Sequence, residues 1–158
     1  KELNVEVSES LPELNSDDVL ILAVKPQDME AACRNVRVNG ALVLSVAAGL
    51  SIDTLSRYLG GTRRIVRTMP NTPGKIGLGV SGMFAEAEVS EADRAAADRI
   101  MRSIGLTVWL DEEAQLAAAV PPTSFTCSAR CKLPLRRKGS AKKMPAPSVS
   151  PRLKVQSP

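Results

Sequence analysis

The chain has 158 residues, of which 44% are hydrophobic and 24% are charged, and its formal net charge is +4. These values are typical of one globular domain, no apolar run approaches the roughly 20 residues that span a bilayer, and no signal peptide is visible, so we expect a cytoplasmic protein without a membrane segment. Three cysteines and no histidine argue against a disulfide framework and a zinc site, so we predict no metal.

The charge is divided sharply near Val120. Residues 121–158 hold nine of the 21 Lys and Arg residues, none of the 17 Asp and Glu residues, and seven of the 11 prolines. This segment shows neither helical nor strand periodicity, as expected of a segment that cannot bury a core. We therefore predict one domain in residues 1–120 and a disordered, Pro-rich basic tail in residues 121–158.

Short apolar runs alternate with helical patterns along the predicted domain. Residues 18–24 are rich in branched side chains, as in a parallel strand buried on both faces. Pro26 then suits the first turn of a helix, where its missing N–H costs nothing. We expect strands at 18–24, 41–46, 65–67, 80–84 and 106–110, and helices after Pro26, at 51–59 and at 90–103. Such alternation predicts an α/β sheet with right-handed crossovers.

Unusual loops follow three of the predicted strands. Lys25-Pro26 follows the first strand, Ala47-Ala48-Gly49 the second and Met-Pro-Asn-Thr-Pro at 69–73 the third. Ligands of parallel α/β sheets bind at the carboxyl ends of the strands, so we expect a site where these loops meet. Small residues let a ligand approach the backbone, and two prolines stiffen a loop that leaves the Asn71 amide and the Thr72 hydroxyl exposed.

Each feature also has a purely structural interpretation. Gly49 can be a plain strand-to-helix turn, Lys25 can simply be solvated, and the Pro-Asn-Thr-Pro loop can be a rigid turn. Ser10 fits a capping box with Glu13, and the acidic residues 111–113 are typical partners of a helix dipole. Taken one at a time, the loops leave these alternatives open.

Taken together, four segments resemble the pyrroline-5-carboxylate reductase family. They are Asp-Val-Leu-Ile-Leu-Ala-Val-Lys-Pro-Gln at 18–27, Leu-Ser-Val-Ala-Ala-Gly-Leu at 44–50, Arg-Thr-Met-Pro-Asn-Thr-Pro at 67–73 and Gly-Leu-Thr-Val-Trp-Leu at 105–110. Their order and spacing are the family's, and the resemblance covers residues 1–120. It implies an incomplete Rossmann-like, doubly wound sheet. It also implies an oxidoreductase of proline biosynthesis that reduces 1-pyrroline-5-carboxylate to proline with NAD(P)H.

The resemblance also assigns positions around the cofactor, NADP or NAD. The residues implied in cofactor binding are Ser10, Ala23, Val24, Lys25, Pro26, Val46, Ala47 and Ala48. Asn71 and Thr72 would lie beside the nicotinamide and the substrate. No residue of this chain is assigned as catalytic. The expected partners are a small-molecule substrate and, as in the family, further copies of the protein, with no metal and no membrane.

Two parts that the family needs for activity find no counterpart in this sequence. The family's glycine-rich phosphate turn lies between its first strand and first helix, which would precede Lys1. The Ser-Gly-Ser-Gly-Pro-Ala-Tyr segment expected after Val120 does not occur. We therefore expect this chain to be inactive by itself. The choice between NAD and NADP is made at the end of the second strand, so the sequence does not predict it.

The tail has two competing interpretations. In a shifted reading frame, residues 121–128 can encode Ala-Tyr-Phe-Phe-Tyr-Leu-Leu and residues 143–157 can encode a helix, both similar to the family's dimerisation domain. The tail would then be a frameshifted remnant of that domain. Alternatively, its basic residues bind an anionic partner such as nucleic acid or a membrane surface. Phe125 is its one aromatic residue, so stacking on bases is poorly provided for.

The frameshift interpretation predicts the DNA that surrounds this coding segment. We expect a Gly-rich strand-turn-helix segment upstream in any frame, and the reductase's second domain downstream of codon 120 in another frame. Sequencing the genomic DNA on both sides checks this expectation. Finding neither segment would show that the interpretation is wrong.

Overall fold

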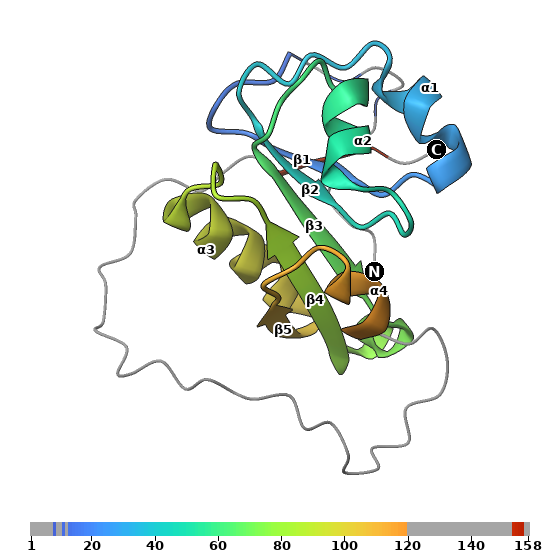
Figure 1. Cartoon of the computed structure of the whole chain (residues 1–158), viewed down its shortest axis with the longest axis vertical. Helices are drawn as coiled ribbons and strands as arrows, with labels where there is room; N and C mark the ends of the chain where they lie inside the picture. The colour runs from blue at the N-terminus through green and yellow to red at the C-terminus, as the bar shows by residue number, and fades with distance from the viewer. Residues whose placement is uncertain (1–7, 9–10, 12, 120–152, 157–158) are drawn as a thin grey trace.

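The computed structural model of the chain describes residues 8, 11, 13–119 and 153–156. One sheet with the strand order β5-β4-β3-β2-β1-β6 forms its centre (Figure 1). The strands are β1 (Val19–Leu22), β2 (Leu42–Ser45), β3 (Ile65–Pro70), β4 (Gly79–Ala85), β5 (Gly105–Trp109) and β6 (Leu153–Gln156). The helices are α1 (Met29–Cys33), α2 (Ile52–Tyr58), α3 (Glu91–Met101) and α4 (Gln115–Ala119). The 3-10 turns are η1 (Pro26–Asp28), η2 (Thr72–Ile76) and η3 (Arg102–Ile104).

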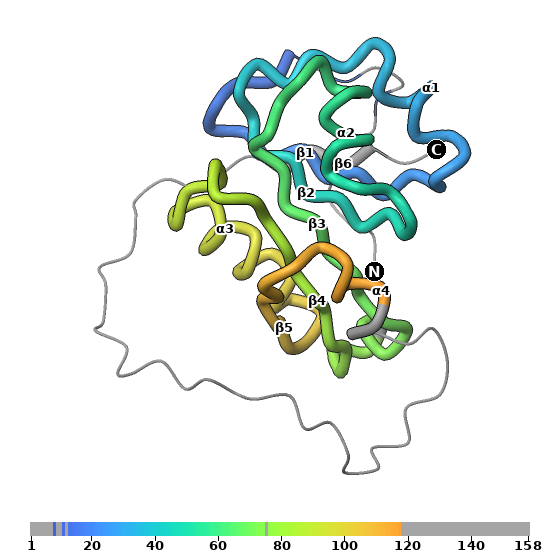
Figure 2. Tube along the Cα trace, in the orientation of Figure 1, coloured from blue at the N-terminus to red at the C-terminus, as the bar shows by residue number. Residues whose placement is uncertain are grey.

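Strands β1, β2 and β3 form a parallel ladder with helices on both of its faces. Leu20, Val43 and Ile65 lie side by side in this ladder and pack with the apolar side chains of α1 and α2. Their neighbours Val19 and Val66 belong to a second core, which includes Ala97 and Met101 of α3. Successive strand residues point to opposite faces, so one ladder supports both cores. The predicted α/β, doubly wound, incomplete Rossmann-like architecture is confirmed, and Figure 2 traces its winding.

The fourth strand departs from the expected winding. β4 pairs antiparallel with β3, with Arg67 opposite Phe84, and β5 then pairs parallel with β4. The connection from β3 to β4 holds only residues 71–78, whereas a crossover to a parallel neighbour takes about a dozen residues or more. The chain therefore reverses direction through η2, and the right-handed crossover expected for this connection is wrong.

A short strand of the predicted tail adds to the edge of β1. In β6, Leu153 lies opposite Val19 and Gln156 opposite Leu22, in parallel register. An edge strand has unpaired backbone groups that a further extended segment can bond. These four residues thus depart from the predicted disorder. Residues 1–7, 9–10, 12, 120–152 and 157–158 lie outside the described residues, so the domain boundary near Val120 stays a prediction.

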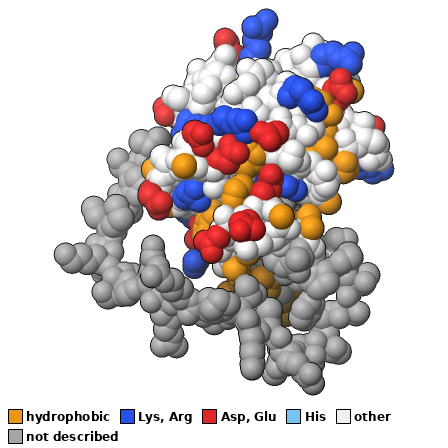
Figure 3. Space-filling view, viewed as in Figure 1, with side chains coloured by type: hydrophobic (Ala, Val, Ile, Leu, Met, Phe, Trp, Pro, Cys, Tyr) orange, Lys and Arg blue, Asp and Glu red, His pale blue; other side chains and the backbone are white. Residues whose placement is uncertain are grey.

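The described surface mixes charges of both signs. Figure 3 shows acidic and basic side chains close together on one face, with apolar side chains between them. Among the described residues, Arg63 pairs with Asp53 at 2.6 Å and with Glu86 at 3.2 Å. The described residues on this face therefore form no one-sided basic surface of the kind typical of nucleic-acid binding. Among the described residues, no helix has the length and hydropathy to cross a membrane.

One arginine joins the start of β3 to three other parts of the domain. The Arg64 guanidinium donates to both carboxylate oxygens of Asp93, at 2.8 Å and 2.6 Å, and to the backbone carbonyls of Ser16 and Gly40. Asp93 also accepts from the hydroxyl of Ser90, the N-cap of α3, at 2.9 Å. These hydrogen bonds hold the pKa of Asp93 below its ordinary value of 3.8, and the bonds from Arg64 make the largest contribution.

This network makes the stability of the domain depend on pH. Because the pKa of Asp93 is lower in the folded state, its contribution is complete above the ordinary value of 3.8 and is lost as the pH falls through the folded-state pKa. We expect Asp93→Asn to lower the free energy of unfolding by about 1–3 kcal/mol at neutral pH. Urea unfolding at neutral pH and at about pH 3 checks this, because the difference from the unchanged chain should shrink in acid. Exposed Glu91→Gln, in the same helical turn, is the control. An equal difference at both pH values would contradict the assignment.

Candidate functional site

The parallel ladder brings two of the predicted loops together directly. The loops at 23–26 and 46–48 follow the carboxyl ends of β1 and β2, which lie next to each other. The backbone N–H of Val46 donates to the carbonyl of Leu22 at 3.1 Å, which continues the ladder into the second loop. Pro26 begins η1, as its fixed φ angle predicts for a first turn.

The predicted cofactor residues divide by exposure. Val24 and Ala47 are buried, at 6% and 5% exposure, and Val46 is half-buried. The exposed members, which a ligand could reach without rearrangement, are Ala23, Lys25, Pro26 and Ala48. Ser10 lies outside the described residues, so neither its predicted cap nor its predicted cofactor contact is addressed.

The third loop follows β3 at the same edge of the sheet. β3 runs parallel to β2, and the Thr68 hydroxyl donates to the Ser45 carbonyl at 3.1 Å. Asn71 is half-buried, and its side-chain oxygen accepts from the backbone N–H of Val80 at 2.9 Å. The expectation that the Asn71 amide is exposed is therefore wrong in part, because its oxygen closes the turn between β3 and β4. Thr72 is exposed, as expected.

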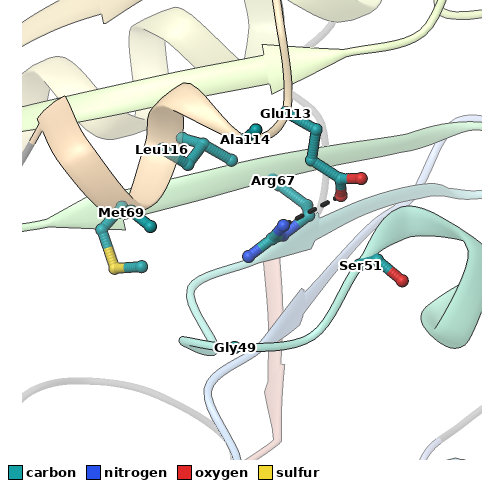
Figure 4. A pocket seen from close by; sticks show the side chains of 8 residues that line it. Gly49, Ser51, Arg67, Met69, Glu113, Ala114 and Leu116 are labelled. Atoms are coloured by element: carbon teal, nitrogen blue, oxygen red, sulfur yellow. Dashed lines mark hydrogen bonds and ion pairs between the residues drawn. The ribbon is translucent and has the colours of Figure 1, made fainter.

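Next to these loops lies an open cavity of about 320 Å³. It is bordered by Gly49, directly after Ala48, and by Met69, two residues before Asn71 (Figure 4). The remaining residues that line it are Ser51, Arg67, Glu113, Ala114, Leu116 and Ala117. The cavity thus lies beside the second and third predicted loops, at the carboxyl edge where a ligand of this fold class binds.

An ion pair forms part of the cavity wall. Arg67, in β3, donates from Nη1 to Oε1 of Glu113 at 2.9 Å, and the side chains are 9% and 29% exposed. The same Glu113 oxygen accepts from the backbone N–H of Ile52, the first residue of α2, at 2.7 Å. The N-cap Ser51 accepts from the Thr54 N–H at 3.2 Å. Two side chains therefore satisfy donors at the start of α2.

The sequence did not identify the Arg67–Glu113 pair. Residues 111–113 were expected to interact with the dipole of the helix that they open, yet Glu113 bonds the first turn of α2, 61 positions earlier in the chain. The signal for Arg67 is an arginine that directly follows the apolar pair Ile65 and Val66 in a predicted buried strand, because a buried charge requires a partner. Nothing in the local sequence names that partner.

Other reactive groups contribute little to the site. Burial raises the pKa of the Cys33 thiol to about 11, so this cysteine is a core residue and a poor nucleophile at neutral pH. Within the part of the chain that the structure describes, no three His, Cys, Asp or Glu side chains are placed to hold a metal ion.

Comparisons with known proteins give one consistent result. The chain is 40% identical over 121 residues to pyrroline-5-carboxylate reductase of Pseudomonas aeruginosa, covering 74% of this chain and 44% of that protein. Among solved structures, a pyrroline-5-carboxylate reductase from Coxiella burnetii matches with a TM-score of 0.57 at 36% identity, covering 65% of this chain and 39% of that one. Plasmodium falciparum pyrroline carboxylate reductase with NADP bound matches with the same TM-score at 24% identity, covering 71% and 46%, which shows the fold alone.

No family model matches the sequence. The chain spans less than half the length of the relatives described above. Within that span, the resemblance seen in the sequence is confirmed.

The Gly49 turn can be tested by substitution. Gly49 has a φ angle of 76°, and an added Cβ would meet no atom within 4 Å, so alanine would be strained by its backbone alone. We expect Gly49→Ala to lower the free energy of unfolding by about 1–2 kcal/mol. In Gly74→Ala, the control, the added Cβ would lie 3.6 Å from the Ile104 side chain, an ordinary contact. Thermal unfolding of both variants measures the difference. Equal transition temperatures would mean that the left-handed turn is dispensable.

Proposed function

Because the chain belongs to the pyrroline-5-carboxylate reductase family over the part that its relatives match, we propose that it is part of an enzyme that reduces 1-pyrroline-5-carboxylate to proline. NADPH or NADH would supply the hydride. The observation that carries this proposal is the placement of three loops, at 23–26, 46–48 and 71–72, at the carboxyl ends of three adjacent parallel strands. Cofactors of such sheets bind at this edge.

The exposed small residues give the loops their proposed role. Ala48 and Ala23 would let the cofactor approach the backbone, and Lys25, exposed beside them, would face its phosphates. Asn71 and Thr72 would border the nicotinamide ring and the imine substrate. Since the Asn71 oxygen is held by the Val80 amide, the group left for a ligand is its NH2. These residues position the reactants, and hydride transfer depends on that positioning.

The Plasmodium falciparum pyrroline carboxylate reductase has NADP bound in its structure. This supports a nicotinamide cofactor for the proposed enzyme. Which nicotinamide nucleotide this chain prefers stays open in the proposal. Three further properties stay predictions: assembly with further copies of the protein, a cytoplasmic location, and anion binding by the basic tail. Apart from Lys154 in β6, the basic residues of the tail lie outside the described part, and no described contact supports anion binding there. Reduction of 1-pyrroline-5-carboxylate is therefore the function that we propose.

A chimeric enzyme tests the proposal directly. Residues 13–119 of this chain would replace the matching segment of the Pseudomonas aeruginosa reductase, to which the chain is 40% identical. We expect the chimera to oxidise NADPH only when 1-pyrroline-5-carboxylate is present. The 158-residue chain alone should not do so, because its described residues include no glycine-rich strand-to-helix turn that could hold the cofactor pyrophosphate.

Within the chimera, Ala48→Glu should raise the KM for NADPH by at least about tenfold, because a carboxylate there would repel the cofactor phosphates. Glu112→Gln, at an exposed position that does not line the cavity, is the control and should leave KM unchanged. A folded chimera without turnover, or equal KM values in both variants, would contradict the proposed function.

A further inference from the structure

We propose that Glu113 is a positioning residue, which seats helix α4 through the Arg67 side chain and the Ile52 amide and thereby forms the wall of the cavity beside the cofactor loops. We call these three groups the Glu113 clamp. The inference rests on the proposed function for the identity of the ligand, but the clamp itself is a feature of this chain.

The clamp joins three elements at a single atom. Oε1 of Glu113 accepts from Arg67 Nη1 at 2.9 Å and from the Ile52 N–H at 2.7 Å. These donors come from β3 and from the first turn of α2. In Figure 4 the Glu113 carboxylate and the Arg67 guanidinium point toward each other and meet at the cavity wall. Two short bonds to one oxygen fix the position of the carboxylate more narrowly than one bond would.

Burial makes each partner dependent on the other. The Arg67 side chain is only 9% exposed, and a guanidinium cannot lose its charge at neutral pH. Glu113 supplies the compensating charge from a segment that is distant in the sequence. Removal of Glu113 would leave a buried charge without its partner, so α4 and β3 are coupled energetically.

Helix α4 has one buried side chain among those that the structure describes. It has only five residues, too few for a helix that is stable by itself. Leu116 is buried at 1% exposure, whereas Gln115 and Ala117 are exposed. One buried side chain fixes the distance of a helix from the sheet but not its rotation about that contact. Glu113, three residues earlier, provides the second fixed point.

The cavity is shared between α4 and the sheet. Four of its eight lining residues come from the segment 113–117, and the other four come from 49–51 and 67–69. If α4 moved together with the turn that precedes it, half of the wall would move. The position of α4 therefore determines the shape of the cavity between Gly49 and Met69, next to the predicted cofactor and substrate residues. Glu113 acts there through α4 and touches no reacting atom in this proposal.

Amide hydrogen exchange in the 158-residue chain tests the clamp without any ligand. The variants are Glu113→Ala, which removes the carboxylate, Glu113→Gln, which keeps a neutral oxygen acceptor, and Glu112→Ala as the exposed neighbouring control. The Ile52 amide reports the contact. The Leu116 amide donates to the Glu113 carbonyl at 3.1 Å, so its exchange rate reports how firmly α4 is held in place. The Val43 amide, which donates to the Arg64 carbonyl at 3.0 Å in the centre of the sheet, reports global stability.

We expect Glu113→Ala to speed exchange at Ile52 and Leu116 by about tenfold or more while changing Val43 by less than about twofold. Glu113→Gln should be intermediate, and Glu112→Ala should match the unchanged chain. Equal acceleration of all three amides would show that Glu113 contributes only to global stability and would overturn the proposal. Unchanged exchange at Leu116 in both Glu113 variants would overturn it as well, and Glu113→Gln decides the matter if Glu113→Ala does not fold. An inactive chimera would refute the proposed function but would leave these exchange rates, and the clamp, untouched.

Discussion

The parallel pairing of β1, β2 and β3 is the constraint on which the rest of the described structure depends. Parallel strands carry their carboxyl ends to the same edge, so the loops at 23–26, 46–48 and 71–72 follow neighbouring strand ends although they are far apart in the sequence. The return connections pass over the faces of the sheet, and their helices α1 and α2 bury one face while α3 covers the other. The ligand edge and the two cores are therefore products of the same ladder.

Charged side chains then fix the parts that the apolar cores leave free. Arg64 joins the start of β3 to the first turn of α3, and Arg67, three positions later, reaches Glu113 on the segment before α4. Side chains alternate between the two faces of a sheet along a strand, so residues two positions apart share a face. Arg64 and Arg67 are three positions apart and therefore lie on opposite faces of the sheet. Each pair joins segments that lie far apart in the sequence, which is the kind of contact that sets how helices sit on a sheet.

Much of this arrangement was predictable because it depends on local patterns. The apolar runs gave the positions of β1, β2 and β5, and Pro26 marked the start of a helical turn, since strand burial and the proline φ angle act over a few residues. The reversal into β4 was missed because only the brevity of the 71–78 connection indicates it. The Asn71 bond to Val80 and the Glu113 bond to Ile52 were missed for a different reason. A polar side chain near a loop predicts that a partner exists, but the fold decides which donor is close enough.

We propose that the three strand-end loops form one nicotinamide-binding edge. The most direct measurement is an NMR titration of the 158-residue chain with reduced nicotinamide mononucleotide, which carries the reactive ring and does not need a pyrophosphate site. We expect amide shift changes at residues 23–25, 46–48 and 71–72, with little change in α3 on the opposite face. Shift changes confined to α3 or to other segments, or no change at millimolar ligand, would contradict it.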